Sequence, residues 1–345
     1  MGRFQFEEVA IPALLITATA VVLIYLCYPP FFIFIASALT IAAYVTKNQK
    51  CLPADVENFF SGFHVGGHRG SPHSFPENSM AGFKQAKIDG ADLIEFDVAL
   101  TSDKKAVLMH DDDLDRTTNL TGPIRDKSRK QLDSANISAN FVRKINLHLD
   151  PVEAEKVPDM EELIKWSVDN QIRMLFDVKD ADTELVDQIA TLFEKYNLYD
   201  KAIVCSFFPW VVYTIKKGNQ RILTGLTWRQ KFWSYHDIEN TKPRYSGIKQ
   251  AIFELIDEVH VFLLKRFTPW YLGADLLLTN NLDISQGLIL DQRRRGMRVA
   301  VWTVNDMAEM HWMLETLKIP ILTDYPEYTK KVLHLENVKK NSYLP

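Results

Sequence analysis

The sequence predicts an α/β protein, a closed (β/α)8 TIM barrel that follows an apolar segment at the amino terminus. Three observations support this fold class. After residue 63, short β-rich runs alternate with amphipathic helical stretches. The first run is not followed by the glycine-rich fingerprint of a dinucleotide-binding sheet. Before that run, no charged residue occurs between Glu8 and Lys47.

Eight short β-rich runs are candidate strands. They are residues 63–67, 93–98, 174–178, 202–207, 222–226, 275–279, 298–304 and 320–323. Helices are predicted between them, because the intervening stretches are amphipathic and several begin at a Ser, Thr or Asp that can cap the first turn. They include 79–89, 159–170, 183–196, 285–295 and 306–317. Eight strand and helix units in roughly 270 residues match a closed barrel better than an open doubly wound sheet.

Two stretches exceed normal loop length. Residues 101–158 contain a further β-like run, 106–110, and are predicted to form a small insertion after the second strand. Residues 228–273 follow the fifth strand and are rich in Trp, Phe, Tyr, Lys and Arg. Because this second insertion leaves the carboxyl end of a strand, we expect it over the mouth of the barrel. Its composition suits either a membrane interface or a lid packed on the rim.

The amino-terminal residues 9–28 are about as long as the ~20 apolar residues that a membrane-spanning helix needs. Pro29 and Pro30 then divide the run, and the second piece, 31–45, is short for a span. One span with an interfacial helix, a re-entrant segment and a helical hairpin all remain open. The predicted organisation is a membrane anchor at 1–50, a linker at 51–62, the barrel at 63–335 and a tail at 336–345.

The side of the plasma membrane or endomembrane on which the barrel lies stays open. Lys47 and Lys50 follow the apolar run and only Arg3 precedes it, which is a weak excess of positive charge on the barrel side. Two N-glycosylation sequons, at Asn119 and Asn136, favour instead a lumenal or extracellular glycoprotein. The net charge of −4, from 40 Lys+Arg and 44 Asp+Glu, argues against nucleic acid as a partner. The three cysteines are too few for a disulfide framework.

Polar residues gather where the predicted strands end. Side chains two apart on a strand share a face, so Glu95 and Asp97 point the same way, as do Asp177 and Lys179. Three carboxylates in one mouth repel each other and need a positive charge to stay ionised. An all-oxygen site suits a divalent cation such as Mg²⁺ or Ca²⁺, of which we favour Mg²⁺, and no Cys/His spacing suggests zinc.

Two histidines and two basic residues complete this set. His68 and His110 can titrate near neutral pH, one accepting a proton as the other donates one. Arg69 and Lys179 supply positive charge for an anion such as phosphate. Each residue alone is more often structural, and only their joint placement at successive strand ends favours a catalytic site.

These residues lie in runs that resemble the glycerophosphodiester phosphodiesterase family. The runs are GGHRG with PENS, ADLIEFDVALTSDKKAVLMHDDDLDRTTN, LFDVK, VWTVN and ILTDYPE, and they extend from about residue 63 to 330. The uncharged amino terminus is also similar to the animal membrane-anchored branch, which acts on glycerophosphoinositol and related lysolipid diesters. The resemblance implies metal-dependent hydrolysis to sn-glycerol 3-phosphate, or its acyl form, and an alcohol.

The resemblance also assigns roles to residues. It implies that His68 and His110 are the acid/base pair and that one divalent cation is bound by the carboxylates. The implied metal ligands are Glu95, Asp97 and Asp177; the implied substrate-binding residues are Arg69, Lys179, Glu77 and Trp302; and the implied supporting residues are Asn78 and Asp111. Asp177 stands where many members have Glu.

Two other functions stay open. A membrane phospholipase C/D-like enzyme that acts on intact phospholipids or lysophospholipids would also pair two histidines around a phosphodiester. A membrane signalling scaffold could keep the barrel without catalysis, although no catalytic group is missing here. The expected partners are therefore the phosphodiester or lysolipid substrate and the bilayer, and protein partners are unknown.

Overall fold

The computed structural model describes residues 19, 21–22, 29–142, 152–329 and 331–332. The chain divides into two compact units, 1–47 and 48–345. The strands of the second unit are β1 (Val65–Gly67), β2 (Leu93–Leu100), β3 (Ala106–Leu108), β4 (Arg173–Val178), β5 (Ala202–Ser206), β6 (Leu223–Trp228), β7 (Leu276–Asn280), β8 (Arg298–Trp302) and β9 (Ile321–Thr323).

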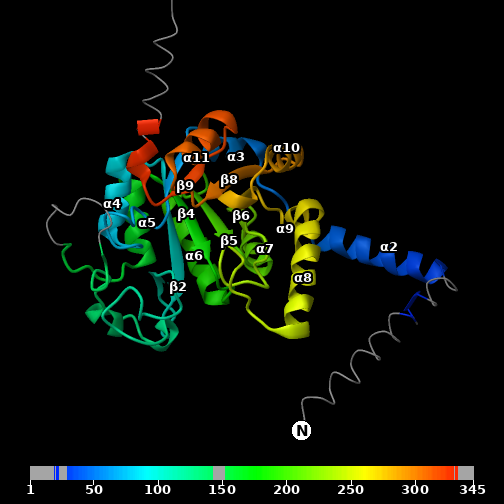
Figure 1. Ribbon diagram of the computed structural model, residues 1–345, viewed down its shortest axis with the longest axis horizontal. Helices are drawn as coiled ribbons and strands as arrows, with labels where there is room; N and C mark the ends of the chain where they lie inside the picture. The colour runs from blue at the N-terminus through cyan, green and yellow to red at the C-terminus, as the bar shows by residue number, and fades with distance from the viewer. Residues whose placement is uncertain (1–18, 20, 23–28, 143–151, 330, 333–345) are drawn as a thin grey trace, which may run out of the picture. The chain divides into compact units, whose positions relative to one another are not determined.

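Eight of these strands form a closed parallel barrel (Figure 1). Their spatial order is β1-β9-β8-β7-β6-β5-β4-β2, and β1 also pairs with β2, so that the barrel closes. β3 adds an antiparallel edge to β2. The predicted (β/α)8 architecture is therefore confirmed, and the carboxyl ends of the parallel strands meet at one mouth.

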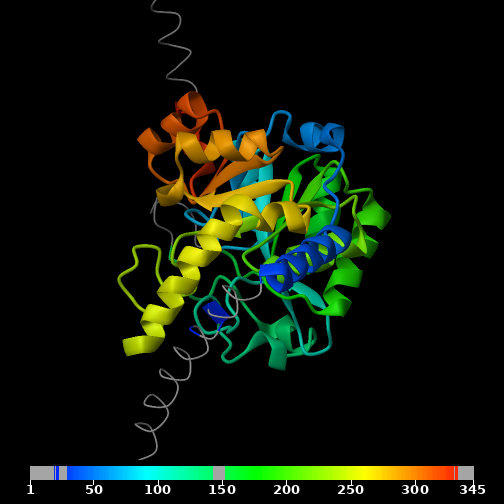
Figure 2. The same cartoon turned by 90° about the vertical axis from the view of Figure 1, so that its right-hand side faces the viewer.

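Helices surround the barrel (Figure 2). They are α4 (Met80–Asp89), α5 (Met160–Asp169), α6 (Thr183–Tyr196), α7 (Pro209–Gly218), α8 (Gly247–Arg266), α9 (Thr268–Leu272), α10 (Gln286–Arg294) and α11 (Met307–His311), which continues as a π-helical turn over Trp312–Thr316. The eight strands and five helices predicted from the sequence are all present, with small shifts at their ends. The predicted capping is also seen, since Ser79 Oγ accepts a hydrogen bond from the backbone N of Gly82 at 2.9 Å.

The alternation of side chains on β2 builds the core and the mouth from one strand. Leu93 points into the barrel and belongs to its interior cluster, whereas Ile94 and Phe96 pack outward against the helices. Glu95 and Asp97 follow Leu93 at two-residue spacing and therefore share its face. The inward face thus changes from leucine to carboxylate toward the carboxyl end, which places charge at the mouth.

The amino end of the barrel is closed by the segment that we predicted to be a linker. Residues 51–62 contain α3 (Pro53–Phe60), which Pro53 opens at a position where proline is tolerated. Phe59 and Phe63 are buried in the same interior cluster as Leu93. This segment is therefore part of the folded barrel, because its aromatic side chains fill the interior at the amino end of the strands.

A buried ion pair lies near this closure. Lys216 of α7 is fully buried, and its Nζ donates to Asp275 Oδ2 at 2.7 Å and to the carbonyl of Ile222 at 2.9 Å. Asp275 also accepts the backbone N–H groups of Cys51 at 3.0 Å and Thr224 at 3.1 Å. Each charge is thus matched by its partner and by backbone dipoles.

Lys216→Met is expected to destabilise the protein by about 3–5 kcal/mol, because it leaves the Asp275 charge buried without its counter-ion. Chemical or thermal unfolding of the purified protein measures this. Lys217→Met is the matched control, since Lys217 is the next residue and is exposed. A loss below about 1 kcal/mol, the range of a surface ion pair, would contradict the assignment.

Both predicted insertions have structure of their own. Residues 101–158 include β3 and two 3-10 turns, Ile124–Asp126 and Gln131–Ser134, around a small apolar cluster. Residues 228–273 form a loop followed by α8 and α9. Phe232 of this loop stacks on Phe207, which follows β5, with ring centroids 4.8 Å apart. The second insertion therefore reaches the strand ends, as its position in the sequence predicts.

The described part of the first unit contains α2 (Pro29–Thr46). This helix begins at the two prolines that divide the apolar run, and proline is tolerated in a first turn because its missing N–H has no partner there. Within the described ranges, no helix has both the length and the apolar character that a bilayer crossing requires. The predicted piece 9–28, apart from residues 19, 21 and 22, and the predicted tail 336–345 lie outside the described residues.

Candidate active site

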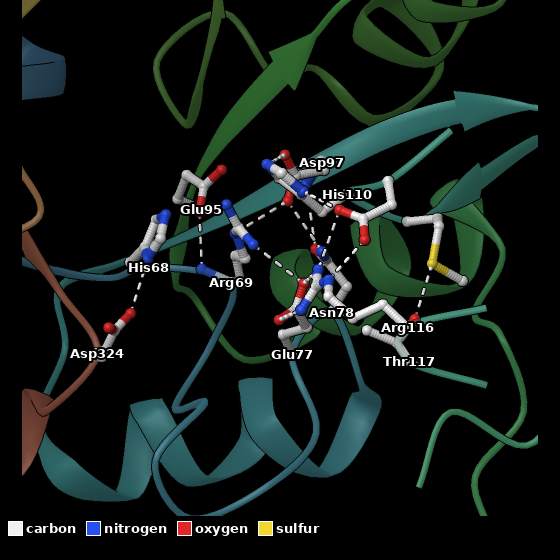
Figure 3. Close-up of polar contacts among 12 residues, drawn as sticks. His68, Arg69, Glu77, Asn78, Glu95, Asp97, His110, Arg116, Thr117 and Asp324 are labelled. Carbon is white, nitrogen blue, oxygen red and sulfur yellow. Dashed lines mark hydrogen bonds and ion pairs between the residues drawn. The ribbon is translucent and has the colours of Figure 1, made fainter. Parts of the chain in front are cut away.

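The turn after β1 presents the first two site residues. His68 N donates to the carbonyl of Thr323 at 2.9 Å, which ties the turn to the end of β9. Arg69 has a φ of 53° and Gly70 a φ of 91°, so the chain reverses sharply here. A Cβ on Gly67 would lie 2.4 Å from the carbonyl oxygen of Gly70, so the turn needs glycine at that position. His68 and Arg69 are thereby held at the mouth (Figure 3).

His68 is oriented by a carboxylate from the last strand. Its Nδ1 lies 2.7 Å from Asp324 Oδ1, and Asn305 Nδ2 donates to Asp324 Oδ2 at 2.8 Å. Burial acts to raise the pKa of Asp324, but the hydrogen bonds from His68 and Asn305 and the charge of His68 hold it below its ordinary value. An ionised carboxylate only accepts hydrogen bonds, so Nδ1 carries a proton and Nε2 is left for chemistry.

His110 is oriented in the same way from the insertion. Its Nδ1 lies 2.5 Å from Asp111 Oδ1, and Arg116 Nε donates to Asp111 Oδ2 at 2.5 Å. The hydrogen bond from His110 lowers the pKa of Asp111, and Arg116 lowers it further against the effect of burial. His110 Nε2 lies 4.0 Å from Asp97 Oδ1. Figure 3 shows His68 and His110 separated by Arg69 and the carboxylates of β2.

Asp97 is the best compensated of the three predicted metal ligands. Its Oδ1 accepts a hydrogen bond from Lys179 Nζ at 3.1 Å, its Oδ2 accepts one from Asn78 Nδ2 at 2.9 Å, and Arg69 Nε lies 3.4 Å from Oδ2. Burial opposes ionisation, but the charges of Lys179, Arg69 and His110 hold the pKa of Asp97 well below its usual range. Asp97 is therefore ionised at neutral pH.

The other two carboxylates are poorly compensated. Glu95 is 4% exposed and accepts the backbone N of Arg69 at 2.7 Å, while burial and repulsion from Asp97 and Asp177 raise its pKa well above the ordinary value. Asp177 is paired in register with Asp97 across β2 and β4. Burial raises the pKa of Asp177 to about 7. Attraction by Lys179 opposes this shift, and repulsion from Asp97 adds to it. Its Oδ1 is buried without a hydrogen-bond partner.

These carboxylates suit a divalent cation. In the part of the chain that the structure describes, no group of three or more His, Cys, Asp or Glu side chains is already arranged as a metal cage. Asp177 Oδ1 nevertheless has no hydrogen-bond partner, and burial disfavours the ionised form of Glu95. A cation bound between these side chains would stabilise both carboxylates. Hard oxygen donors match Mg²⁺ or Ca²⁺. The residues that could hold the ion are Glu95, Asp97 and Asp177.

Glu77 and Lys179 connect the parts of the site. Glu77 Oε1 accepts from Arg69 NH1 at 3.0 Å and from Arg116 NH2 at 2.7 Å, so Glu77 joins the two arginines. Lys179 Nζ donates to the carbonyl of His110 at 2.7 Å besides its bond to Asp97. The two positive groups predicted to meet phosphate thus lie among the carboxylates, and Arg116 adds a third.

Trp302 lies at the carboxyl end of β8, on the rim. Its Nε1 donates to the carbonyl of Leu278 at 3.2 Å, and its ring meets the ring of Phe207 edge to face, with centroids 5.4 Å apart.

Beside His68 and Arg69, a cavity of about 390 Å³ opens between the first strand and the insertion. Its wall combines charged residues with the apolar side chains of Ile137 and Phe141.

Three residues of the site were missed from the sequence. Asp324, Asn305 and Arg116 lie within the runs ILTDYPE, VWTVN and DRTTN, but nothing in their spacing shows what they contact. Asp324 meets His68 across 256 residues of sequence. Only the closure of the barrel between β9 and β1 reveals that contact.

The two sequon asparagines lie side by side in the insertion. Asn119 is exposed, its Nδ2 donates to the carbonyl of Ser134 at 3.2 Å, and its Oδ1 accepts the backbone N of Asn136 at 2.6 Å. Asn136 Oδ1 accepts two backbone N–H groups, from Ser138 at 2.9 Å and Glu155 at 3.1 Å. Glycosylation of either residue stays a prediction.

Arg116→Gln is expected to lower kcat about tenfold, because it releases both Glu77 and Asp111 and lets His110 depart from its productive orientation. Steady-state kinetics on a water-soluble diester of the kind that the family resemblance implies measures this. Arg125→Gln is the matched control, since Arg125 is 66% exposed and pairs only at 3.4 Å with Asp180. An unchanged kcat in Arg116→Gln would show that Asp111 is held without Arg116.

Comparison with known proteins points to one family. The model of the glycerophosphoryl diester phosphodiesterase family matches residues 68–328. Glycerophosphodiester phosphodiesterase 1 of Mus musculus is 33% identical over 262 residues, which is 74% of this chain and 76% of that protein. The protein of the same name from Homo sapiens is 32% identical over 260 residues, with the same coverage.

Solved structures share the fold at lower identity. A glycerophosphodiester phosphodiesterase from Agrobacterium tumefaciens has a TM-score of 0.58 and 20% identity, covering 77% of this chain and 97% of that one. A phosphodiesterase from Oleispira antarctica, solved with the product sn-glycerol 3-phosphate, has a TM-score of 0.59 and 19% identity, covering 79% of this chain and 96% of that one.

Proposed function

The chain belongs to the glycerophosphoryl diester phosphodiesterase family, and we propose that it cleaves glycerophosphodiesters with His68 and His110 as an acid/base pair. As a member it is a phosphoric diester hydrolase. The observation that carries the proposal is the symmetry of the two histidines. Each is held through Nδ1 by a carboxylate, Asp324 or Asp111, which leaves both Nε2 atoms available for proton transfer.

The proton transfers follow from this arrangement. One histidine accepts a proton from the attacking hydroxyl as the new P–O bond forms. The other donates a proton to the alkoxide as the ester P–O bond breaks, so the alcohol leaves neutral. Asp324 and Asp111 stabilise the imidazolium that forms during each transfer. The attacking oxygen can come from water or from the 2-hydroxyl of the glycerol, and the same residues serve both routes.

The charged residues of the site would bind and orient the phosphate. Arg69, Lys179 and Arg116 lie around the carboxylates and supply hydrogen-bond donors for a dianionic transition state. Members of the family generally use a divalent cation, which Glu95, Asp97 and Asp177 would hold and which would neutralise phosphate charge. We propose Mg²⁺ rather than Ca²⁺, because Mg²⁺ is commonly bound by a few carboxylates together with substrate phosphate and water.

We propose glycerophosphoinositol and related lysolipid-type diesters as the substrates. The products would be sn-glycerol 3-phosphate, or its acyl form, and an alcohol. The likeness to the animal glycerophosphodiester phosphodiesterases supports a glycerophosphodiester as the substrate, and the product held in the Oleispira antarctica enzyme supports sn-glycerol 3-phosphate as the product. The apolar wall of the cavity beside His68, which includes Ile137 and Phe141, could accept an acyl chain. Membrane attachment through residues 1–50 would keep the enzyme near its lipid-derived substrates.

A substrate panel tests the proposal. Glycerophosphoinositol, glycerophosphocholine, glycerophosphoethanolamine, lysophospholipids and intact phospholipids would each be incubated with Mg²⁺ and with Ca²⁺. Release of glycerol 3-phosphate, its acyl form or the phosphorylated headgroup would be measured. We expect glycerophosphoinositol to be among the best substrates and chelation to inhibit reversibly. Cleavage of intact phospholipids with no action on glycerophosphoinositol would favour a phospholipase, and the absence of turnover on the whole panel would favour a scaffold.

A further inference from the structure

The helix α8 presents its apolar side chains away from the protein. One long side of this helix lies on the outside of the barrel, seen in yellow in Figures 1 and 2. The outward stripe repeats at helical spacing and is strongly exposed, in Ile248 (50%), Ile252 (51%), Leu255 (65%), Val259 (51%) and Phe262 (65%). An exposed helix in water normally shows the opposite pattern, with polar residues outward. The stripe is therefore a large apolar surface that water alone does not explain.

Two acidic side chains of α8, Asp257 and Glu254, point inward and make hydrogen bonds there. Asp257 is 3% exposed, and it accepts hydrogen bonds from the backbone N of Trp233 at 3.0 Å and of Ser234 at 2.9 Å. Glu254 accepts a hydrogen bond from the hydroxyl of Tyr235 at 2.9 Å. These two charges hold the loop over the mouth. Of the three acidic residues of α8, Glu258 is the one that stays exposed.

A basic cavity lies at the carboxyl end of the same helix. It has a volume of about 260 Å³, and among the described residues its lining includes four basic side chains and no acidic one. The basic residues are Lys50, Lys265, Arg266 and Arg295, of which Arg295 pairs with Asp291 at 3.1 Å. Trp270, which is 41% exposed, contributes to the same wall. Positive charge beside an amphipathic aromatic ring suits the phosphate level of an anionic membrane.

The chain enters the barrel beside this surface. Asn48, the first residue of the second unit, donates its backbone N to the carbonyl of Tyr271 in α9 at 3.0 Å and its Nδ2 to the carbonyl of Tyr213 at 2.9 Å. The uncharged stretch of sequence ends two residues earlier, at Thr46. The first residue of the second unit thus lies against α9.

We propose that the outward stripe of α8, together with the basic cavity at its end, is a docking surface for an anionic phospholipid bilayer. The stripe lies among the upper acyl chains, and Lys265 and Arg266 meet the lipid phosphates. A second copy of the chain fits this surface less well. Two α8 helices paired antiparallel would place Lys249 of one against the basic end of the other, and a parallel pair would oppose the two basic ends directly.

Photocrosslinking of the full-length chain in lipid vesicles tests the proposal. The photoreactive residue p-benzoyl-phenylalanine would replace Leu255 or Phe262, and each variant would be mixed with vesicles of phosphatidylcholine and phosphatidylserine. The same replacement at Ile88 of α4, whose side chain is 68% exposed, is the control. We expect lipid adducts at Leu255 and Phe262 in several-fold excess over Ile88. Adducts between two protein chains, or lipid yields equal to that at Ile88, would overturn the proposal.

Charge reversal tests the basic cavity separately. The double variant Lys265→Glu with Arg266→Glu should lower lipid crosslinking from Leu255 about tenfold in vesicles that contain phosphatidylserine, with little effect in pure phosphatidylcholine. Thermal unfolding would verify that the variant remains folded, and the exposed position of both residues predicts that it does. Equal crosslinking by the double variant and the parent chain in phosphatidylserine vesicles would overturn the role of the cavity.

Discussion

His68→Ala and His110→Ala should each lower kcat for glycerophosphodiester hydrolysis by about 10²- to 10⁴-fold while the protein stays folded. Each histidine handles one proton of the reaction, so its removal leaves that proton transfer to solvent. Asp324→Asn should also lower kcat, because an amide can donate to Nδ1 of His68 and hold the ring in the wrong tautomer. Release of glycerol 3-phosphate, with circular dichroism on each variant, measures these effects.

His64→Ala is the matched control for the histidine variants. His64 directly precedes β1, at the end of the barrel opposite His68, and it is exposed. Its removal should leave kcat unchanged. Full turnover in either His68→Ala or His110→Ala would refute the acid/base assignment, whereas loss of turnover in all three variants would indicate a general effect on folding.

Asp177→Asn should stabilise the metal-free protein at pH 8 by on the order of 1–3 kcal/mol while lowering activity. The gain arises because Asp177 Oδ1 is buried without a partner beside two other carboxylates. The pKa of Asp177 is about 7 in the folded protein, above the ordinary 3.8, so the folded state binds the proton more tightly. The cost of ionising Asp177 is therefore absent near pH 4, grows up to about pH 7 and is constant above.

Thermal unfolding from pH 4 to pH 8 in the presence of a chelator measures this difference. Asp180→Asn is the control, because Asp180 is three residues further along, 41% exposed in its side chain and paired with Arg125. Titration with Mg²⁺ should raise the melting temperature of the parent protein more than that of Asp177→Asn, since the variant has lost a ligand. If Asp177→Asn is less stable than the parent at pH 8, the carboxylate is compensated in a way that the structure does not show.

Local patterns were sufficient to predict most of the barrel. The alternation on β2 places Leu93, Glu95 and Asp97 on one face whatever the rest of the chain does, and so it predicts the clustered carboxylates. Helix starts such as Ser79 follow from capping chemistry within one turn. The stretch 51–62 was harder, because its composition resembles a linker and only the barrel provides the space that Phe59 and Phe63 fill.

The partners of the site residues could not be predicted from spacing. Arg116 could have paired with any of several acidic residues around it, and the fold directs it to Glu77 and Asp111. The inward orientation of Asp257 was equally hidden, because a helix has no fixed inner face until it packs. The composition of the 228–273 insertion suits a membrane interface and a lid equally, and the structure shows that the apolar stripe of α8 is exposed.

The order of strands and helices, the strand ends that carry charge and the family could be read from the sequence, because these depend on side-chain periodicity and on short contiguous runs. Only the folded barrel shows that Asp324 orients His68, that Arg116 joins Glu77 to Asp111, and that Asp177 Oδ1 is buried without a hydrogen-bond partner. Those contacts join segments far apart in sequence or rest on a turn's exact path, and they exist only once the barrel has closed and brought the strand ends together.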